Sequence, residues 1–62
     1  MAAGFFLVWD DGDPESVTAP SKVRRARYAT LDEARAQGEH DLSLGKRVLR
    51  IEDEAGATVW EP

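Results

Sequence analysis

The chain contains no cysteine, so neither a disulfide nor a thiolate zinc site can hold it together. It also lacks a long hydrophobic run. The apolar stretch from Phe5 to Trp9 stops at Asp10, far short of the roughly 20 residues that span a bilayer. No Lys or Arg precedes this stretch, so it does not have the form of a signal peptide. These absences predict a cytoplasmic, bacterial protein with no membrane contact.

An excess of positive charge is missing as well. Twelve acidic residues against eight basic ones leave a net charge of −4, which disfavours non-specific attraction to nucleic acid. The length of 62 residues predicts a single domain over residues 1–62. Because a chain of this size buries only about 60% of its unfolded surface, its stability rests on a small apolar core, a partner or both.

Local patterns nevertheless predict four strands and one helix. The stretch "GFFLVWD" is rich in strand-forming residues, and a loop with Gly12 and Pro14 follows it. Thr30 and Glu33 form a capping box at the start of a helix, and Gly45 is placed to end it. Gly56 favours the turn of a closing hairpin. The expected elements are strands at 4–10 and 22–29, a helix from 31 to 42 or 44, and hairpin arms at 48–53 and 57–61.

The predicted fold class is therefore α+β, with order ββαββ and one helix packed on a three- or four-stranded, largely antiparallel sheet. Alternation along the strands predicts which side chains meet the helix. The expected core is Phe5, Leu7, Trp9, Tyr28, Leu31, Ala34, Leu42, Leu49, Ile51 and Val59. If the first strand has the opposite register, Phe6 and Val8 replace its odd-numbered residues.

Two segments resemble a class of small bacterial strand-strand-helix-strand-strand domains of unknown function. They are "RYATLDEA" (27–34) and "RVLRIEDEAGATVW" (47–60). The resemblance implies the same fold, and it brings no catalytic or ligand-binding residue with it. The long loop after the first strand departs from that class.

A basic run is the first candidate site. If the second strand is extended, Arg24 points to one face and Arg25 and Arg27 to the other. Together with Lys22 they could form a nucleic-acid-binding surface, with Tyr28 or a tryptophan available to stack on a base. The alternative is an edge strand that its charges protect against pairing with other chains.

An apolar sheet face is the second candidate. One helix covers one face of the sheet, yet the first strand is apolar on both. An interaction surface is therefore predicted on the other face, formed by Phe6, Val8, Val48 and Trp60. In the alternative interpretation, arginine stems, the long loop or the C-terminal residues fold over that face.

The remaining candidates are weaker. Asp10, Asp11, Asp13 and Glu15 could attract a cation, but their spacing does not follow the calcium-loop pattern, so no metal site is predicted. His40 lies between Glu39 and Asp41, with Ser43 as the nearest hydroxyl. A chain this small offers no obvious pocket around them, so neither an enzyme nor a cofactor is predicted.

The sequence thus predicts a non-enzymatic protein-interaction module that self-associates as a homodimer or binds another protein through the apolar sheet face. The alternative is a weak nucleic-acid-binding module that uses Lys22 to Arg27.

Overall fold

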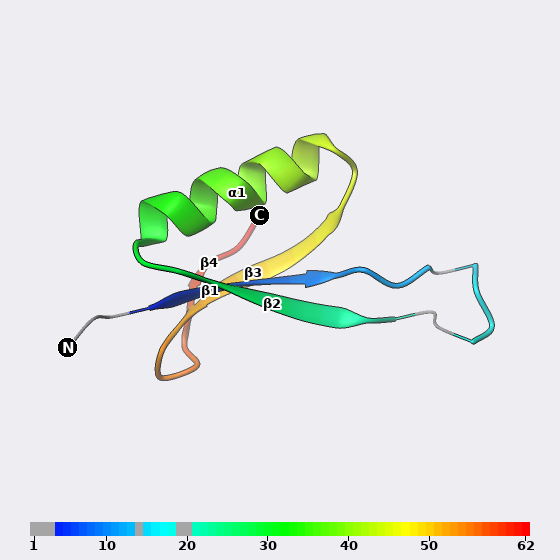
Figure 1. Ribbon diagram of the computed structural model, residues 1–62, viewed down its shortest axis with the longest axis horizontal. Coiled ribbons are helices and arrows are strands. Elements are labelled where there is room, and N and C mark those ends of the chain that lie inside the picture. The colour runs from blue at the N-terminus through cyan, green and yellow to red at the C-terminus, as the bar shows by residue number, and fades with distance from the viewer. Residues whose placement is uncertain (1–3, 14, 19–20) are drawn as a thin grey trace.

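The computed structural model describes residues 4–13, 15–18 and 21–62. In order, they form β1 (Phe5–Asp10), β2 (Val23–Tyr28), α1 (Leu31–Ser43), β3 (Arg47–Asp53) and β4 (Thr58–Trp60). The strands make one sheet in the order β2-β1-β3-β4, and every neighbouring pair is antiparallel. Helix α1 lies across one face of this sheet (Figure 1). The predicted ββαββ fold is confirmed, while Pro14 and Pro20 of the predicted loop lie outside the described residues.

Local signals set both ends of α1. At the start, the Thr30 hydroxyl accepts a hydrogen bond from the Glu33 amide at 3.2 Å, as the capping pattern predicts. At the end, Gly45 has a φ of +84°, a conformation that glycine adopts without the steric cost of a Cβ. This turn brings the Lys46 amide to the Asp41 carbonyl at 3.0 Å, which completes a Schellman motif.

The core lies between α1 and the three longer strands. It is formed by Leu7, Ala34, Val48 and Ile51, and the residues packed around these four are Phe5, Trp9, Tyr28, Leu31 and Trp60. The odd-numbered side chains of β1 therefore face the helix, which was the first of the two predicted registers. The even-numbered residues, Phe6 and Val8, lie on the opposite face, called the open face below because no helix of the described chain covers it.

The buried stripe of α1 differs from the predicted one. Ala34, Gly38 and Asp41 are buried, whereas Leu42, a predicted core residue, is exposed. Each helical residue turns by about 100°, so Leu42 lies about 80° around the helix from Ala34 and outside the arc from Asp41 to Gly38. Asp41 lies about 20° from Ala34, and its carboxylate accepts a hydrogen bond from the side-chain amide of Gln37 at 2.9 Å.

A β-bulge in β3 corrects the predicted placement of Val48. Val8 pairs with Arg50 but Trp9 pairs with Val48, so Leu49 is an extra residue in the ladder. The bulge reverses the alternation before it, and Val48 faces the helix together with Ile51. Val48 is 6% exposed and Leu49 is 37% exposed, the opposite of the predicted assignment.

A second irregularity, between β3 and β4, corrects the predicted placement of Trp60 on the face opposite the helix. Ile51 pairs with Trp60 and Glu52 with Thr58, which leaves Val59 as the extra residue. Trp60 therefore shares the helix face with Ile51, and a Cβ at Gly38 would lie only 3.3 Å from its ring. Val59, predicted in the core, is exposed instead.

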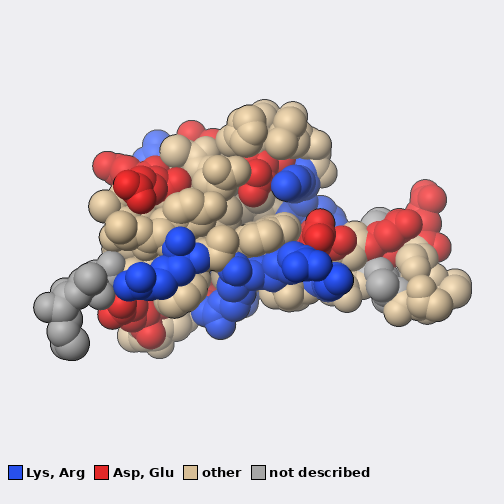
Figure 2. Space-filling view, viewed as in Figure 1, with Lys and Arg blue, Asp and Glu red and all other residues tan. Residues whose placement is uncertain are grey.

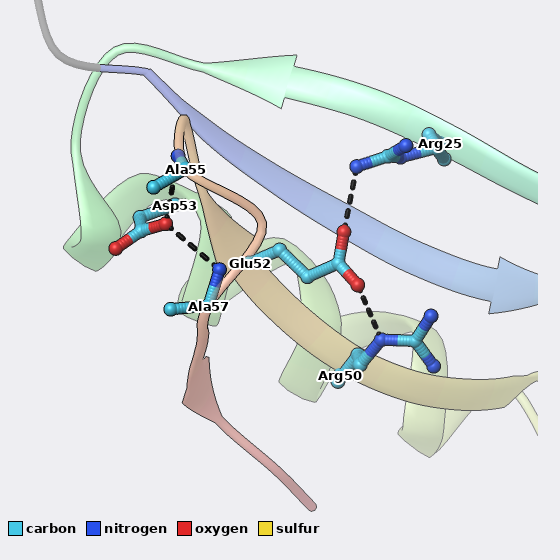
Figure 3. Close-up of polar contacts among 6 residues, drawn as sticks. All are labelled: Arg25, Arg50, Glu52, Asp53, Ala55 and Ala57. Atoms are coloured by element: carbon cyan, nitrogen blue, oxygen red, sulfur yellow. Dashed lines mark hydrogen bonds and ion pairs between the residues drawn. The ribbon is translucent and has the colours of Figure 1, made fainter.

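The turn between β3 and β4 is held by one side chain. Asp53 Oδ1 accepts hydrogen bonds from the amides of Ala55 and Ala57, each at 2.9 Å (Figure 3). Gly56 has a φ of +86°, as expected for the left-handed position that follows a short turn. This turn places Glu52, the last open-face residue of β3, at the end of a fixed hairpin.

Candidate functional site

The open face of the sheet holds apolar residues that charged side chains cover. Val8 lies in the central strand β1, and its cross-strand neighbours are Arg25 on β2 and Arg50 on β3. Although no helix of the described chain lies above it, Val8 is only 1% exposed. Val8 thus lies between two arginines, whose long stems can bury apolar surface while their charged ends stay in water.

Glu52 joins the two arginines over Val8. One of its carboxylate oxygens accepts a hydrogen bond from Arg25 Nη2 and the other from Arg50 Nε, each at 2.6 Å (Figure 3). We call Arg25, Glu52 and Arg50 the open-face clamp. Its carboxylate is the best protected of the three groups, since the Glu52 side chain is only 12% exposed.

The two arginines of the clamp favour the ionised form of the Glu52 carboxylate. The hydrogen bond from Arg50 is the main cause that lowers the pKa of Glu52, and the positive charges of Arg50 and Arg25 lower it further. Partial burial and the nearby Asp53 act in the opposite direction on this pKa, but they do not prevail. Glu52 is therefore ionised at neutral pH and holds both arginines in place.

Arg25 also covers the second apolar residue of this face. Its guanidinium carbon lies 5.1 Å from the centre of the Phe6 ring, within the range of a cation–π contact. Of the predicted interaction surface, Phe6 and Val8 are thus on the open face but partly or fully covered. Val48 and Trp60 are on the helix face, so the structure does not bring the four together.

The predicted basic strand is found at the edge of the sheet. Lys22 immediately precedes β2, and the side chains of Arg24, Arg25 and Arg27 are each roughly half exposed. Figure 2 shows Lys and Arg atoms gathered in a row on this side of the molecule, along β2. Alternation along an extended strand predicts Arg24 on one face and Arg25 on the other, and the register agrees, since Arg25 lies opposite Val8 and Arg24 opposite Trp9.

Carboxylates of the same chain lie beside this basic row. Arg24 pairs with Asp11 at 3.0 Å and Arg27 with Glu54 at 3.6 Å, and in both pairs the carboxylate is also about half exposed. Exposed ion pairs of this kind contribute little to stability and exchange readily with other partners. The pair of Arg25 with Glu52 is shorter and better protected, so Arg25 is held more firmly than its neighbours.

The backbone of β2 is open on its outer side. Among the described residues, β1 is the only strand that pairs with β2. The Asp11 amide donates to the Lys22 carbonyl at 2.8 Å, and hydrogen bonding alternates along an antiparallel ladder. The amides and carbonyls of Val23, Arg25 and Arg27 therefore point away from β1, toward the free edge.

Asp10 closes the base of the loop between β1 and β2. Its carboxylate accepts hydrogen bonds from the amides of Gly12 and Lys22, both at 2.8 Å, and from the Ser21 hydroxyl at 3.0 Å. The hydrogen bond from the Lys22 amide is the largest cause that lowers the pKa of Asp10, followed by that from Gly12. Partial burial opposes this lowering, while Ser21 and the charge of Arg47 support it.

The other predicted candidates are placed apart. Within the described segments, no three carboxylates or histidines lie close enough together to hold a metal ion. His40 is exposed near the end of α1, and the Ser43 hydroxyl donates to the backbone carbonyl of His40 at 2.6 Å. That hydroxyl is thus engaged by the backbone of the helix end.

Sequence reasoning missed Glu52 and Arg50 as members of a site. Their spacing of two residues in one strand predicts that they share a face, and that signal was present. Their contact with Arg25 depends on β1 lying between β2 and β3, which no local pattern reveals.

Comparisons with known proteins give no further guide to the site. No family model, no curated protein and no solved structure matches this chain. The resemblance to small bacterial domains of unknown function therefore stays a prediction. In the part of the chain that the structure describes, no helix has the length and apolar character needed to cross a membrane.

Proposed function

We propose that this protein is a non-enzymatic protein-interaction module that contacts its partner through the free edge of β2. One observation carries the proposal. A strand edge with outward-facing backbone groups is bordered by a row of exposed basic side chains, on a chain whose net charge is negative. Unpaired strand edges are a common site for the addition of a partner strand.

The structure gives less support to the open face as a contact surface than the sequence did. An apolar interface needs exposed apolar area, and Val8 is almost completely buried under the open-face clamp. Phe6 is the remaining apolar side chain of the predicted patch on this face, and Arg25 lies over its ring. Self-association through this face stays a prediction. Sedimentation equilibrium of the native chain and of Phe6→Glu would test it, because a dimer built on this patch must weaken in the variant.

Nucleic-acid binding by Lys22 to Arg27 remains the alternative proposal. The row of basic atoms along β2 favours it. The outward backbone groups of β2 act against it, since a nucleic acid has no amides and carbonyls at strand spacing to pair with them. Bacterial origin and a cytoplasmic location likewise stay predictions.

A selection experiment tests the proposed function without a known partner. Random extended peptides would be selected for binding to the immobilised chain, and the contact of each binder mapped by amide chemical shifts of the labelled protein. We expect the largest changes at Val23, Arg25 and Arg27. Failure to select any binder, or shifts centred on the exposed side of α1, would reject the β2 edge as the contact surface.

A further inference from the structure

The chemistry of the β2 edge also restricts what can bind there. We propose that its partner is an acidic, extended segment of another protein, which pairs antiparallel with β2 and adds a strand to the sheet. This inference rests on the proposed function, because it assumes that the β2 edge is the contact surface. It adds the charge, the conformation and the residue pattern of the partner.

The backbone argues for an extended partner. The amides and carbonyls of Val23, Arg25 and Arg27 face outward at every second residue, with two-residue spacing of roughly 7 Å. A second strand provides N–H and C=O groups at the same spacing, so it can complete the ladder. Every strand pair in this sheet is antiparallel, and we infer the same orientation for the added strand.

The side chains argue for an acidic partner. Residues directly opposite each other in neighbouring strands interact, so a strand beside β2 would place its side chains against Arg24, Arg25 and Arg27. Opposite charges at these positions are favourable and like charges are unfavourable. The present partners of Arg24 and Arg27 are half-exposed carboxylates, which an incoming carboxylate can replace at little cost.

The same rule disfavours a second copy of this chain. Antiparallel pairing of two β2 edges would bring the arginines of one strand close to those of the other, and β2 itself contains no acidic residue to face them. A nucleic acid offers negative charge but no strand of amides and carbonyls to complete the ladder. An acidic peptide strand satisfies both the backbone and the charges.

Antiparallel pairing with β2 determines which type of residue the partner strand should have at each position. Read along the partner, the residues opposite Arg27, Ala26, Arg25 and Arg24 would be acidic, small or β-branched, acidic and acidic. The clamp keeps Arg25 bound to Glu52, so we expect the carboxylates opposite Arg24 and Arg27 to contribute most.

The test uses blocked synthetic peptides and the full chain. The first peptide has a central Glu-Thr-Glu-Glu flanked by threonines. The second has glutamine in place of each glutamate, and the third keeps the glutamates but carries N-methyl groups on the amides that would face β2. Calorimetry or fluorescence anisotropy would give the affinities, with a single-stranded oligothymidylate as the nucleic-acid comparison.

We expect the first peptide to bind about tenfold more tightly than the second, as three cross-strand charge pairs predict. The double variant Arg24→Ala/Arg27→Ala should remove most of that difference. Arg35→Ala is the matched control, because Arg35 is equally exposed and pairs with Glu39 on α1, away from β2. The N-methylated peptide should not bind detectably.

The outcomes separate the two proposals. If selected peptides map to β2 but the glutamine or N-methylated peptide binds as well as the first, this inference fails and the proposed function stands. If no peptide maps to β2, both fail. If the oligothymidylate binds more tightly than the acidic peptide, and Arg24→Ala/Arg27→Ala abolishes that binding, the partner is a nucleic acid and the inference is wrong.

Discussion

Glu52 on β3 and Arg25 on β2 meet across the intervening strand β1, with 2.6 Å between Oε1 and Nη2. Val8 lies beneath this contact in the central strand and is buried on a face that no helix covers in the described chain. A single carboxylate on the open face thus binds two arginines, one from β2 and one from β3. The outer edge of β2 lies beside this clamp and pairs with no strand of the described chain.

Neutralising Glu52 should destabilise the fold more than neutralising the exposed Glu54. Glu52→Gln weakens two charge-assisted hydrogen bonds at once and leaves two arginines close together over Val8. We expect the midpoint of thermal unfolding to fall by several degrees. Glu54→Gln is the control, because its pair with Arg27 is longer and exposed. Equal midpoints for the two variants would show that the clamp has no role in stability.

Acid should weaken the fold through two named carboxylates. The pKa values of Glu52 and Asp10 are lowered in the folded state, from ordinary values of 4.5 and 3.8. Their contribution is therefore present above those ordinary values and is lost as the pH falls through the lower folded-state pKa values. Urea unfolding at neutral pH and at about pH 3 should show a loss of stability that is smaller in Glu52→Gln/Asp10→Asn. An identical acid sensitivity in that variant would assign the effect to other groups.

The β-bulge in β3 predicts that Val48 contributes more to stability than Leu49. Unbroken alternation along the strand would predict the opposite. Val48→Ala removes buried methyl groups and should cost about 2 kcal/mol of unfolding free energy. Leu49→Ala removes a larger but exposed side chain, and we expect a smaller cost. Denaturant unfolding of both variants is the measurement. A larger loss for Leu49→Ala would mean that β3 has no bulge at this position.

Gly38 should not accept a larger side chain. A Cβ at this position would lie 3.3 Å from Leu7 Cδ1 and 3.3 Å from the Trp60 ring, so Gly38→Val adds further atoms to a filled space. Overpacking of this kind costs about 1–3 kcal/mol. Ala36→Val on the exposed side of α1 introduces the same side chain and should cost only about 0.5 kcal/mol in helix propensity. If both variants unfold at the same denaturant concentration, α1 does not pack on the sheet through Gly38.

Features that depend on neighbouring residues in the chain were predictable from sequence. The helix start at Thr30 and its end before Gly45 follow from cap residues, and the faces of β2 follow from simple alternation. The positions of Val48 and Trp60 were predicted wrongly, because each follows a ladder irregularity that only strand pairing creates. The clamp could not be derived for the same reason, since it joins β2 and β3 across β1.

If an acidic strand completes the ladder of β2, the outward-facing amides of β2 become hydrogen-bonded, and amide hydrogen exchange detects that change. Exchange would be followed residue by residue, with and without the peptide that has a central Glu-Thr-Glu-Glu. We expect new protection at the amides of Val23, Arg25 and Arg27, with little change at the amides of Arg24 and Ala26, which face β1. Unchanged exchange at the three outward amides while the peptide is bound would contradict this expectation.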